Sequence, residues 1–168
     1  MELLILRHGV AVPRGSSEYP SDGDRPLTPE GTKGMRKIAK GMRAMDLAFD
    51  RVFSSPLVRT KQTAEIALRG LRSGPSIDYT EHLQPDGDLE VFIGECLTKC
   101  GEEDRILIVG HEPYLSGLVS FLVCGDDSMG MNLRKGGLCK LGIDSLRIGK
   151  CARLEWLLGP QQLQNLKQ

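Results

Sequence analysis

The stretch Leu3-Leu4-Ile5-Leu6-Arg7-His8-Gly9 decides the fold of this chain. Its four consecutive apolar residues are too few for an ordinary helix and are typical of a strand buried on both faces of a sheet. Arg7 and His8 follow where that strand ends, just before a glycine-marked turn. Ligands of open α/β sheets bind at the carboxyl ends of the strands. A guanidinium beside an imidazole at this point therefore indicates a site for an anionic substrate.

The composition describes an ordinary globular chain. Its 168 residues are enough for one domain with a core of its own, and 40% of them are hydrophobic. The 22 Lys and Arg balance the 22 Asp and Glu, so no overall charge would attract nucleic acid or an anionic membrane. No apolar stretch approaches the roughly 18 residues of a membrane span, and the first strand begins at once, without a leader pattern. We therefore expect a cytoplasmic protein.

The cysteines and carboxylates give no metal-binding pattern. The five cysteines are an odd number, which suits reduced thiols in the cytoplasm. Cys96 and Cys100 would share one helix face, but a structural zinc site needs a second pair of ligands, and none lies nearby in the sequence. No cluster of carboxylates has ligand spacing either. We expect neither a metal nor another cofactor.

Strand and helix signals alternate along the rest of the chain. Thr28 and Pro29 are typical of the start of a helix, and apolar residues then recur at helical spacing to about residue 45. Further helices are predicted near 56–71, 89–100 and 113–123, and further strands near 51–54, 77–79, 106–110, 137–143 and 151–158.

This alternation predicts a three-layer α/β/α sandwich with a mainly parallel sheet of about six strands, one edge strand of which is antiparallel. We expect a single domain over residues 1–160. The polar tail over 161–168 is expected to be frayed.

Four short motifs occur in a fixed order along the chain: Leu6-Arg7-His8-Gly9, then Arg25-Pro26-Leu27-Thr28 with Gly31, then Ser54-Ser55-Pro56-Leu57 leading to Arg59 and Gln62-Thr63-Ala64, then Gly110-His111. Together they resemble the histidine phosphatase superfamily, also called the phosphoglycerate-mutase-like proteins. The short length, the segment 85–88 and the stretch Gly110-His111-Glu112-Pro113 look most like the SixA group of phosphohistidine phosphatases.

The resemblance implies a role for each matching residue. His8 would be the nucleophile, a neutral imidazole that attacks phosphorus and becomes a phosphohistidine. Arg7 and Arg59 would bind the phosphoryl oxygens with their planar forks of donors. His111 would hydrogen-bond the same oxygens, either as a cation or through a ring N–H. Arg25 would line the phosphate pocket or brace the loop, and the sequence leaves both roles open.

The general acid is where this chain departs from the wider family. Mutases and many phosphomonoesterases place a carboxylic acid after the third strand to protonate the leaving oxygen. Glu81 is the nearest candidate here, while Asp86 and Asp88 could equally be solvated turn residues. The P–N bond of phosphohistidine is labile, so its cleavage depends less on a strong general acid. Val10 and Ala11 also lack the polar groups with which mutases meet a phosphosugar acid.

These features favour a phosphatase that acts on phosphohistidine of a protein, for example a phosphotransfer domain. The chain has few residues beyond the core elements, so we expect a shallow cleft that admits a displayed histidine. One alternative is a phosphatase of small esters, such as sugar or nucleotide phosphates, with Glu81 as general acid. Another is a phosphate-binding domain without turnover. A P-loop nucleotide triphosphatase is excluded, because no Gly-x4-Gly-Lys-Ser/Thr motif occurs. The sequence does not disclose the oligomeric state.

Overall fold

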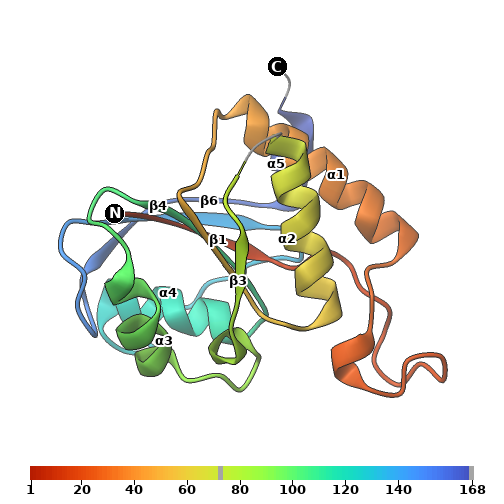
Figure 1. Ribbon diagram of the computed structural model, residues 1–168, viewed down its shortest axis with the longest axis horizontal. Coiled ribbons are helices and arrows are strands. Elements are labelled where there is room, and N and C mark those ends of the chain that lie inside the picture. Colours follow the sequence, from red (N-terminus) through yellow and green to blue (C-terminus); the bar gives the residue numbers. More distant parts are fainter. Residues whose placement is uncertain (72–73, 167–168) are drawn as a thin grey trace.

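The computed structural model describes residues 1–71 and 74–166. Its described part contains a six-stranded sheet (Figure 1). The order of the strands is β3-β2-β4-β1-β5-β6. The strands are β1 (Glu2–Arg7), β2 (Arg51–Ser54), β3 (Ile77–Tyr79), β4 (Arg105–Gly110), β5 (Leu138–Ile143) and β6 (Ala152–Leu158). The helices are α1 (Pro29–Ala44), α2 (Val58–Leu71), α3 (Leu89–Glu95), α4 (Tyr114–Cys124) and α5 (Pro160–Asn165), with 3-10 turns η1 (Asp22–Asp24), η2 (Glu81–Leu83) and η3 (Leu97–Lys99).

The pairing of the strands confirms the predicted fold class. The strands β3, β2, β4 and β1 run parallel to their neighbours. The strand β5 is antiparallel to β1, and the edge strand β6 is antiparallel to β5. The sheet is thus mainly parallel, with antiparallel pairing at one edge, and β1 lies inside it between β4 and β5.

Helices cover both faces of this sheet, because the apolar run of β1 points its side chains alternately up and down. Leu4 and Leu6 pack in a core with α1, α2 and α5. Leu3 and Ile5 pack in a second core with α3 and α4. None of these four residues exposes more than 1% of its surface, so each stabilises the fold by about 1.5–3 kcal/mol. Figure 1 shows the two layers on opposite sides of the strands.

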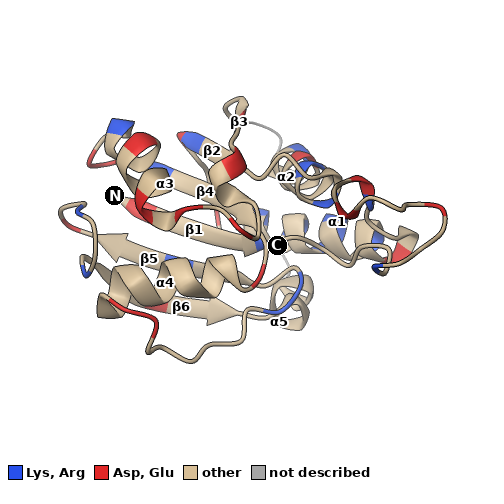
Figure 2. Cartoon of the chain, turned by 90° about the horizontal axis from the view of Figure 1, so that it is seen from below, with Lys and Arg blue, Asp and Glu red and all other residues tan. Residues whose placement is uncertain are grey.

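Helix α1 begins as predicted and presents one apolar face to the sheet. The Thr28 side chain accepts a hydrogen bond from the backbone of Gly31 at 2.9 Å, and Pro29 occupies the first helical position. Met35, Ile38 and Met42 form the buried face. The opposite face carries exposed basic residues, which recur along the helix in Figure 2. The zero net charge of the chain is therefore unevenly distributed.

The expectation of a frayed tail over 161–168 is wrong for the described part of it. Pro160–Asn165 form the helix α5, and Leu163 is completely buried. The helix packs closely on α1 because Gly41 has no side chain: a Cβ there would meet the Leu163 carbonyl oxygen at 1.9 Å. One buried leucine thus orders a segment that is otherwise polar. Residues 167–168 lie outside the described residues.

No helix in the described ranges combines the length and the apolar character that crossing a membrane requires.

Candidate active site

The neighbouring parallel strands β1 and β4 bring two histidines together. Arg7 at the end of β1 is paired with Gly110 at the end of β4. The next residues are His8 and His111, and the backbone N–H of His8 donates to the Gly110 carbonyl at 3.1 Å. The centroids of the two imidazole rings are 5.1 Å apart. The strand order therefore supplies the adjacency that the sequence does not show.

A cavity of about 480 Å³ opens beside these strand ends. It is lined by Arg7, His8, Val10, Ala11, Pro13, Arg14, Arg25, Arg59, Pro85, His111, Glu112 and Lys135. Five of these residues are Lys or Arg, and one is a carboxylic acid. An excess of cations around a small volume creates a local positive potential. The cavity therefore suits an anion, although the chain as a whole is neutral.

His8 is held in the form that a nucleophile needs. Its side chain is buried, and Nδ1 lies 2.7 Å from the carbonyl oxygen of Gly9. A carbonyl oxygen can accept but not donate, so Nδ1 carries the hydrogen and Nε2 keeps its lone pair. Burial, together with the charges of Arg59 and Arg7, lowers the pKa of His8 to about 3, against the opposing effect of the Gly9 hydrogen bond. The imidazole is neutral at pH 7.

His111 is also neutral. Burial and the nearby Arg59 guanidinium lower its pKa to about 2. Its Nε2 lies 2.9 Å from the hydroxyl of Ser55, and its Nδ1 is buried without a partner among the described residues. If the Ser55 hydroxyl donates to Nε2, then Nδ1 carries the hydrogen. Of the two forms open to His111, cation or ring N–H, the electrostatics favour the N–H.

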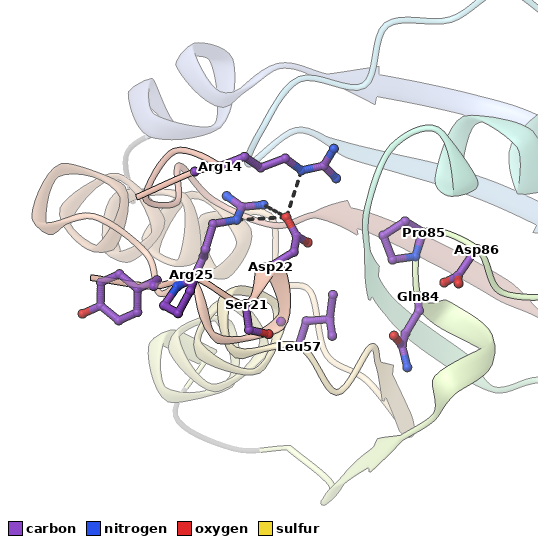
Figure 3. Close-up of a pocket in the computed structure, with 12 residues that line it drawn as sticks. Arg14, Ser21, Asp22, Arg25, Leu57, Gln84, Pro85 and Asp86 are labelled. Atoms are coloured by element: carbon purple, nitrogen blue, oxygen red, sulfur yellow. Dashed lines mark hydrogen bonds and ion pairs between the residues drawn. The ribbon is translucent and has the colours of Figure 1, made fainter. Parts of the chain in front are cut away.

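Arg59 is held in place by Asp22, a residue of the loop before α1 that the sequence did not mark as part of the site. The Arg59 side chain is almost fully buried and donates to the Asp22 backbone carbonyl at 2.6 Å and to Asp22 Oδ2 at 2.9 Å. Arg25 donates to Asp22 Oδ1 through Nε and Nη2, and Arg14 donates to the same oxygen at 2.8 Å. Figure 3 shows the Asp22 carboxylate between Arg14 and Arg25.

The charges around Asp22 keep it ionised. Partial burial by itself would raise the pKa of Asp22, but the Arg25 hydrogen bond and the positive charges of Arg59, Arg25 and Arg14 lower it to about 2. Arg25 also donates to the Val12 carbonyl and lines the cavity. The structure thus gives Arg25 a place in both roles that the sequence left open, lining the pocket and bracing the loop.

Several donors of the site have no partner within the described chain. Arg7 donates through Nη1 to the Leu133 carbonyl at 2.9 Å, while its Nε is buried and unpaired. The Nε of Arg59 and the Nδ1 of His111 are buried and unpaired as well. Burying a donor without a partner costs free energy. These N–H groups are available to the oxygens of a bound anion.

Glu81, the predicted general acid, is not brought to this cavity. It is exposed on η2 and is not among the lining residues. The chain that follows η2 does reach the cavity, through Pro85. Glu112 is the carboxylic acid that lines the cavity. Its position directly after His111 in the sequence could have identified it as a candidate.

Within the described ranges, no group of three or more His, Cys, Asp or Glu side chains could hold a metal ion. Cys96 and Cys100 are free thiols, and burial raises the pKa of both. The positive charge of the cavity comes from Arg and Lys side chains.

Comparison with known proteins identifies the class. The family model of the histidine phosphatase superfamily (branch 1) matches residues 3–84. The phosphohistidine phosphatase SixA of Escherichia coli K12 is 30% identical over 128 residues, which are 75% of this chain and 76% of SixA. An uncharacterized protein of Picosynechococcus is 34% identical over 149 residues, 88% of each chain. The structure of the protein histidine phosphatase SixA complexed with tungstate superposes with a TM-score of 0.81 at 25% identity, covering 97% of this chain and 99% of that one.

The chain belongs to the histidine phosphatase superfamily, as its motifs predicted. Within that superfamily its similarity in sequence and structure is to SixA. Its activity is therefore that of a phosphatase of the metal-independent histidine type.

Proposed function

We propose that this phosphatase removes the phosphoryl group from phosphohistidine on a protein, through a covalent phosphohistidine intermediate on His8. The observation that carries the proposal is the state of His8: a buried neutral imidazole, with Nδ1–H held by the Gly9 carbonyl, in a cavity lined by arginines. An unprotonated ring nitrogen beside a phosphate site is what nucleophilic attack on phosphorus requires.

In the first step the lone pair of His8 Nε2 attacks the phosphorus atom of the substrate. The P–N bond of the substrate breaks, and its electron pair stays on the leaving imidazole nitrogen. If the other ring nitrogen of the substrate carries a hydrogen, the imidazole leaves as a neutral molecule. The phosphorylated ring of His8 keeps its own Nδ1–H and carries a positive charge, which partly offsets the phosphoryl charge. No proton has to be supplied during this transfer.

The cations of the cavity would stabilise the charge on the transferring group. The unpaired N–H groups of Arg7, Arg59 and His111 are oriented before the substrate arrives, because each residue is held by another contact. Preorganised donors in a buried site contribute more than the same donors in water. We assign phosphate binding to Arg7 and Arg59, with Arg25 lining the same cavity and His111 as the uncharged donor.

Two observations favour a protein-borne phosphohistidine over a small ester. First, Glu81 is exposed and is not among the residues that line the cavity, so the acid that an alkoxide leaving group needs is not supplied by Glu81. Second, a hollow of about 690 Å³ adjoins the cavity and shares Arg14, Arg25 and Pro85 with it. Figure 3 shows Arg14 and Arg25 on one side of this hollow and Gln84, Pro85 and Asp86 on the other. The hollow gives room for polypeptide beyond the phosphoryl group.

A substrate panel tests the proposal. Initial rates are measured for a phosphorylated phosphotransfer domain, phosphoramidate, p-nitrophenyl phosphate and several sugar phosphates at equal concentration. The proposal predicts that both P–N substrates are cleaved faster than the esters, and that Glu81→Gln changes no rate. Equal rates, or faster cleavage of the sugar phosphates, would reject it in favour of the ester phosphatase. Phosphate binding without any turnover would instead identify a phosphate-binding domain.

The cytoplasm is the location that we propose. All five cysteines are free thiols, which is typical of a reducing compartment.

A further inference from the structure

Glu112 is the carboxylic acid among the residues that line the cavity of His8 and His111. One of its oxygens, Oε2, accepts a hydrogen bond from the Ser116 hydroxyl at 2.5 Å. The other oxygen, Oε1, is buried and has no partner among the described residues. Ser116 thus fixes the carboxylate from one side and leaves the second oxygen unpaired. A buried acceptor without a donor costs free energy, so this oxygen calls for a physical explanation.

A bound phosphoryl group does not provide the missing partner. Its oxygens accept hydrogen bonds, and they suit the unpaired N–H groups of Arg7, Arg59 and His111. A carboxylate close to the same oxygens meets like charge. The partner of Oε1 must therefore be a group that brings a hydrogen into the cavity. In the reaction proposed above, the water that discharges the phosphorylated enzyme is such a group.

A structural role for Glu112 has to be separated from a chemical one. Burial lowers the pKa of Arg7, and the negative charge of Glu112 opposes this effect. Glu112 could thus act by keeping the Arg7 guanidinium in place. Such a positioning role would affect the transfer of phosphoryl to His8 and its removal from His8 alike, since Arg7 faces the same phosphoryl group in both steps.

We propose that Glu112 is the general base that takes a proton from the water that hydrolyses the phosphorylated His8. The inference rests on the proposed function. An O–H bond of water breaks and its proton goes to Oε1, while the water oxygen forms a bond to phosphorus. The P–N bond to His8 breaks, and its electron pair returns to Nε2. His8, with its Nδ1–H, is again a neutral imidazole, and the proton on Glu112 passes to solvent when phosphate leaves.

The geometry of displacement at phosphorus makes this role specific to the second step. Attacking and leaving atoms lie in line, so the water occupies the place that the substrate imidazole has vacated. That imidazole leaves without needing a proton, whereas water becomes a good nucleophile when it loses one. The carboxylate therefore acts on the water and has little effect on the transfer from a P–N donor.

Rapid-quench kinetics of Glu112→Gln test the inference. Phosphoramidate labelled with ³²P is mixed with the enzyme, and the label on protein is followed over time. We expect transfer to His8 within about threefold of wild type, and discharge of the phosphoenzyme slowed by about 10²-fold or more. The variant should then accumulate label that the wild type turns over. Hydroxylamine, a nucleophile that does not need this base, should discharge the variant as fast as the wild type.

Glu103→Gln is the matched control. It makes the same carboxylate-to-amide change at an exposed residue just before β4, at the opposite end of the strand from His111. It should leave both steps unchanged. Glu112→Asp keeps a carboxylic acid at this position, so it tests the inference even if Glu112→Gln does not fold. It should discharge the phosphoenzyme faster than Glu112→Gln and more slowly than wild type.

Three outcomes would overturn the inference. Equal slowing of transfer and discharge would make Glu112 a positioning residue for Arg7. Unchanged discharge in Glu112→Gln, or discharge in Glu112→Asp as slow as in a folded amide variant, would also contradict it. Failure of the proposed function looks different, because the wild type would then carry no label on His8 at any quench time.

Discussion

The two sides of the cavity hold their functional groups in different ways. On one side, Arg7, His8 and His111 stand at the ends of adjacent parallel strands, and the core on both faces of the sheet fixes those strands. On the other side, the loop carrying Asp22 reaches Arg59 of α2 through hydrogen bonds and ion pairs. The strand ends carry the groups that would form and break bonds, while the loop carries groups that hold other side chains.

This difference predicts a gradient of effects. In the proposed mechanism, a change at a strand end removes a group that contacts the phosphoryl group, and no neighbour can replace it. A change in the loop loosens an arginine that keeps its charge and its other contacts. Loss of activity should therefore be larger on the strand side than on the loop side. Each of the following experiments can contradict that order.

His8→Ala should have the largest effect, since it removes the proposed nucleophile. We expect kcat for phosphoramidate to fall by about 10³-fold or more, because loss of a nucleophile leaves the activity of the binding groups alone. Initial rates at saturating phosphoramidate measure this fall in kcat. His82→Ala is the control, since the third histidine is not among the residues lining the cavity, and its rate should match wild type. A His8→Ala variant within tenfold of wild type would exclude the covalent route.

Arg7→Ala should follow, because it removes a preorganised donor from the strand side. We expect kcat/KM to fall by about 10²-fold. The comparison is with Arg69→Ala, which removes an exposed guanidinium paired with Glu65 on the surface of α2 and should leave kcat/KM unchanged. If the two variants behaved alike, Arg7 would not contact the transferring group.

Asp22→Asn should have a smaller effect, because Arg59 keeps its bond to the Asp22 backbone carbonyl. We expect kcat/KM to fall by about tenfold, close to the lower end of the range for one hydrogen bond to a charged group. Asp144→Asn breaks an exposed ion pair with Arg153 and serves as control. A loss larger than that of Arg7→Ala would reverse the order of the two sides.

The same variant should change the pH dependence of stability. The folded pKa of Asp22, about 2, lies below its usual value of 3.8. The ionised carboxylate therefore stabilises the folded chain fully above pH 4, and this contribution disappears as the pH falls toward 2. Urea unfolding should show wild type more stable than Asp22→Asn at pH 6, with the difference shrinking below pH 4. A difference that is constant with pH would mean that the arginines do not hold the charge of Asp22.

The smallest expected effect is the absence of a change. Because the pKa values of His8 and His111 are lowered to about 3 and about 2, neither ring should gain a proton between pH 8 and pH 5. Nitrogen-15 NMR of the imidazoles, assigned with single histidine variants, should show constant shifts for both rings over this range. Titration of either ring near pH 6.5 would show that the strand side is more open to water than the structure indicates.

Much of the strand side could be predicted from the sequence. The apolar runs of β1 and β4 each end in a histidine, and the rule for parallel sheets places both ends on one edge. The side-by-side position of the two strands could not be derived from composition or periodicity, because strand order depends on contacts between distant segments. The motifs of the superfamily supplied that information.

The loop side could not be predicted in the same way. Asp22 lies in a stretch rich in Pro and Gly, where no periodicity marks a side chain as buried or paired. Its contact with Arg59 spans 37 residues. Glu81 illustrates the opposite case, since its place after β3 suggested a role, whereas its side chain is exposed and is not among the residues that line the cavity. The ordering of α5 by Leu163 was missed because one buried residue gives no pattern.

Transfer of phosphoryl to His8 is the central claim, and mapping the phosphoenzyme tests it most directly. The wild-type enzyme is mixed with a phosphorylated phosphotransfer domain and quenched in alkali within the first turnover. The enzyme is then digested, and the phosphorylated residue is identified by mass spectrometry. We predict one transient phosphoryl group, on His8, that disappears as free phosphate is formed. A phosphoryl group on another residue, or release of phosphate with no phosphorylated enzyme at any time, would contradict it.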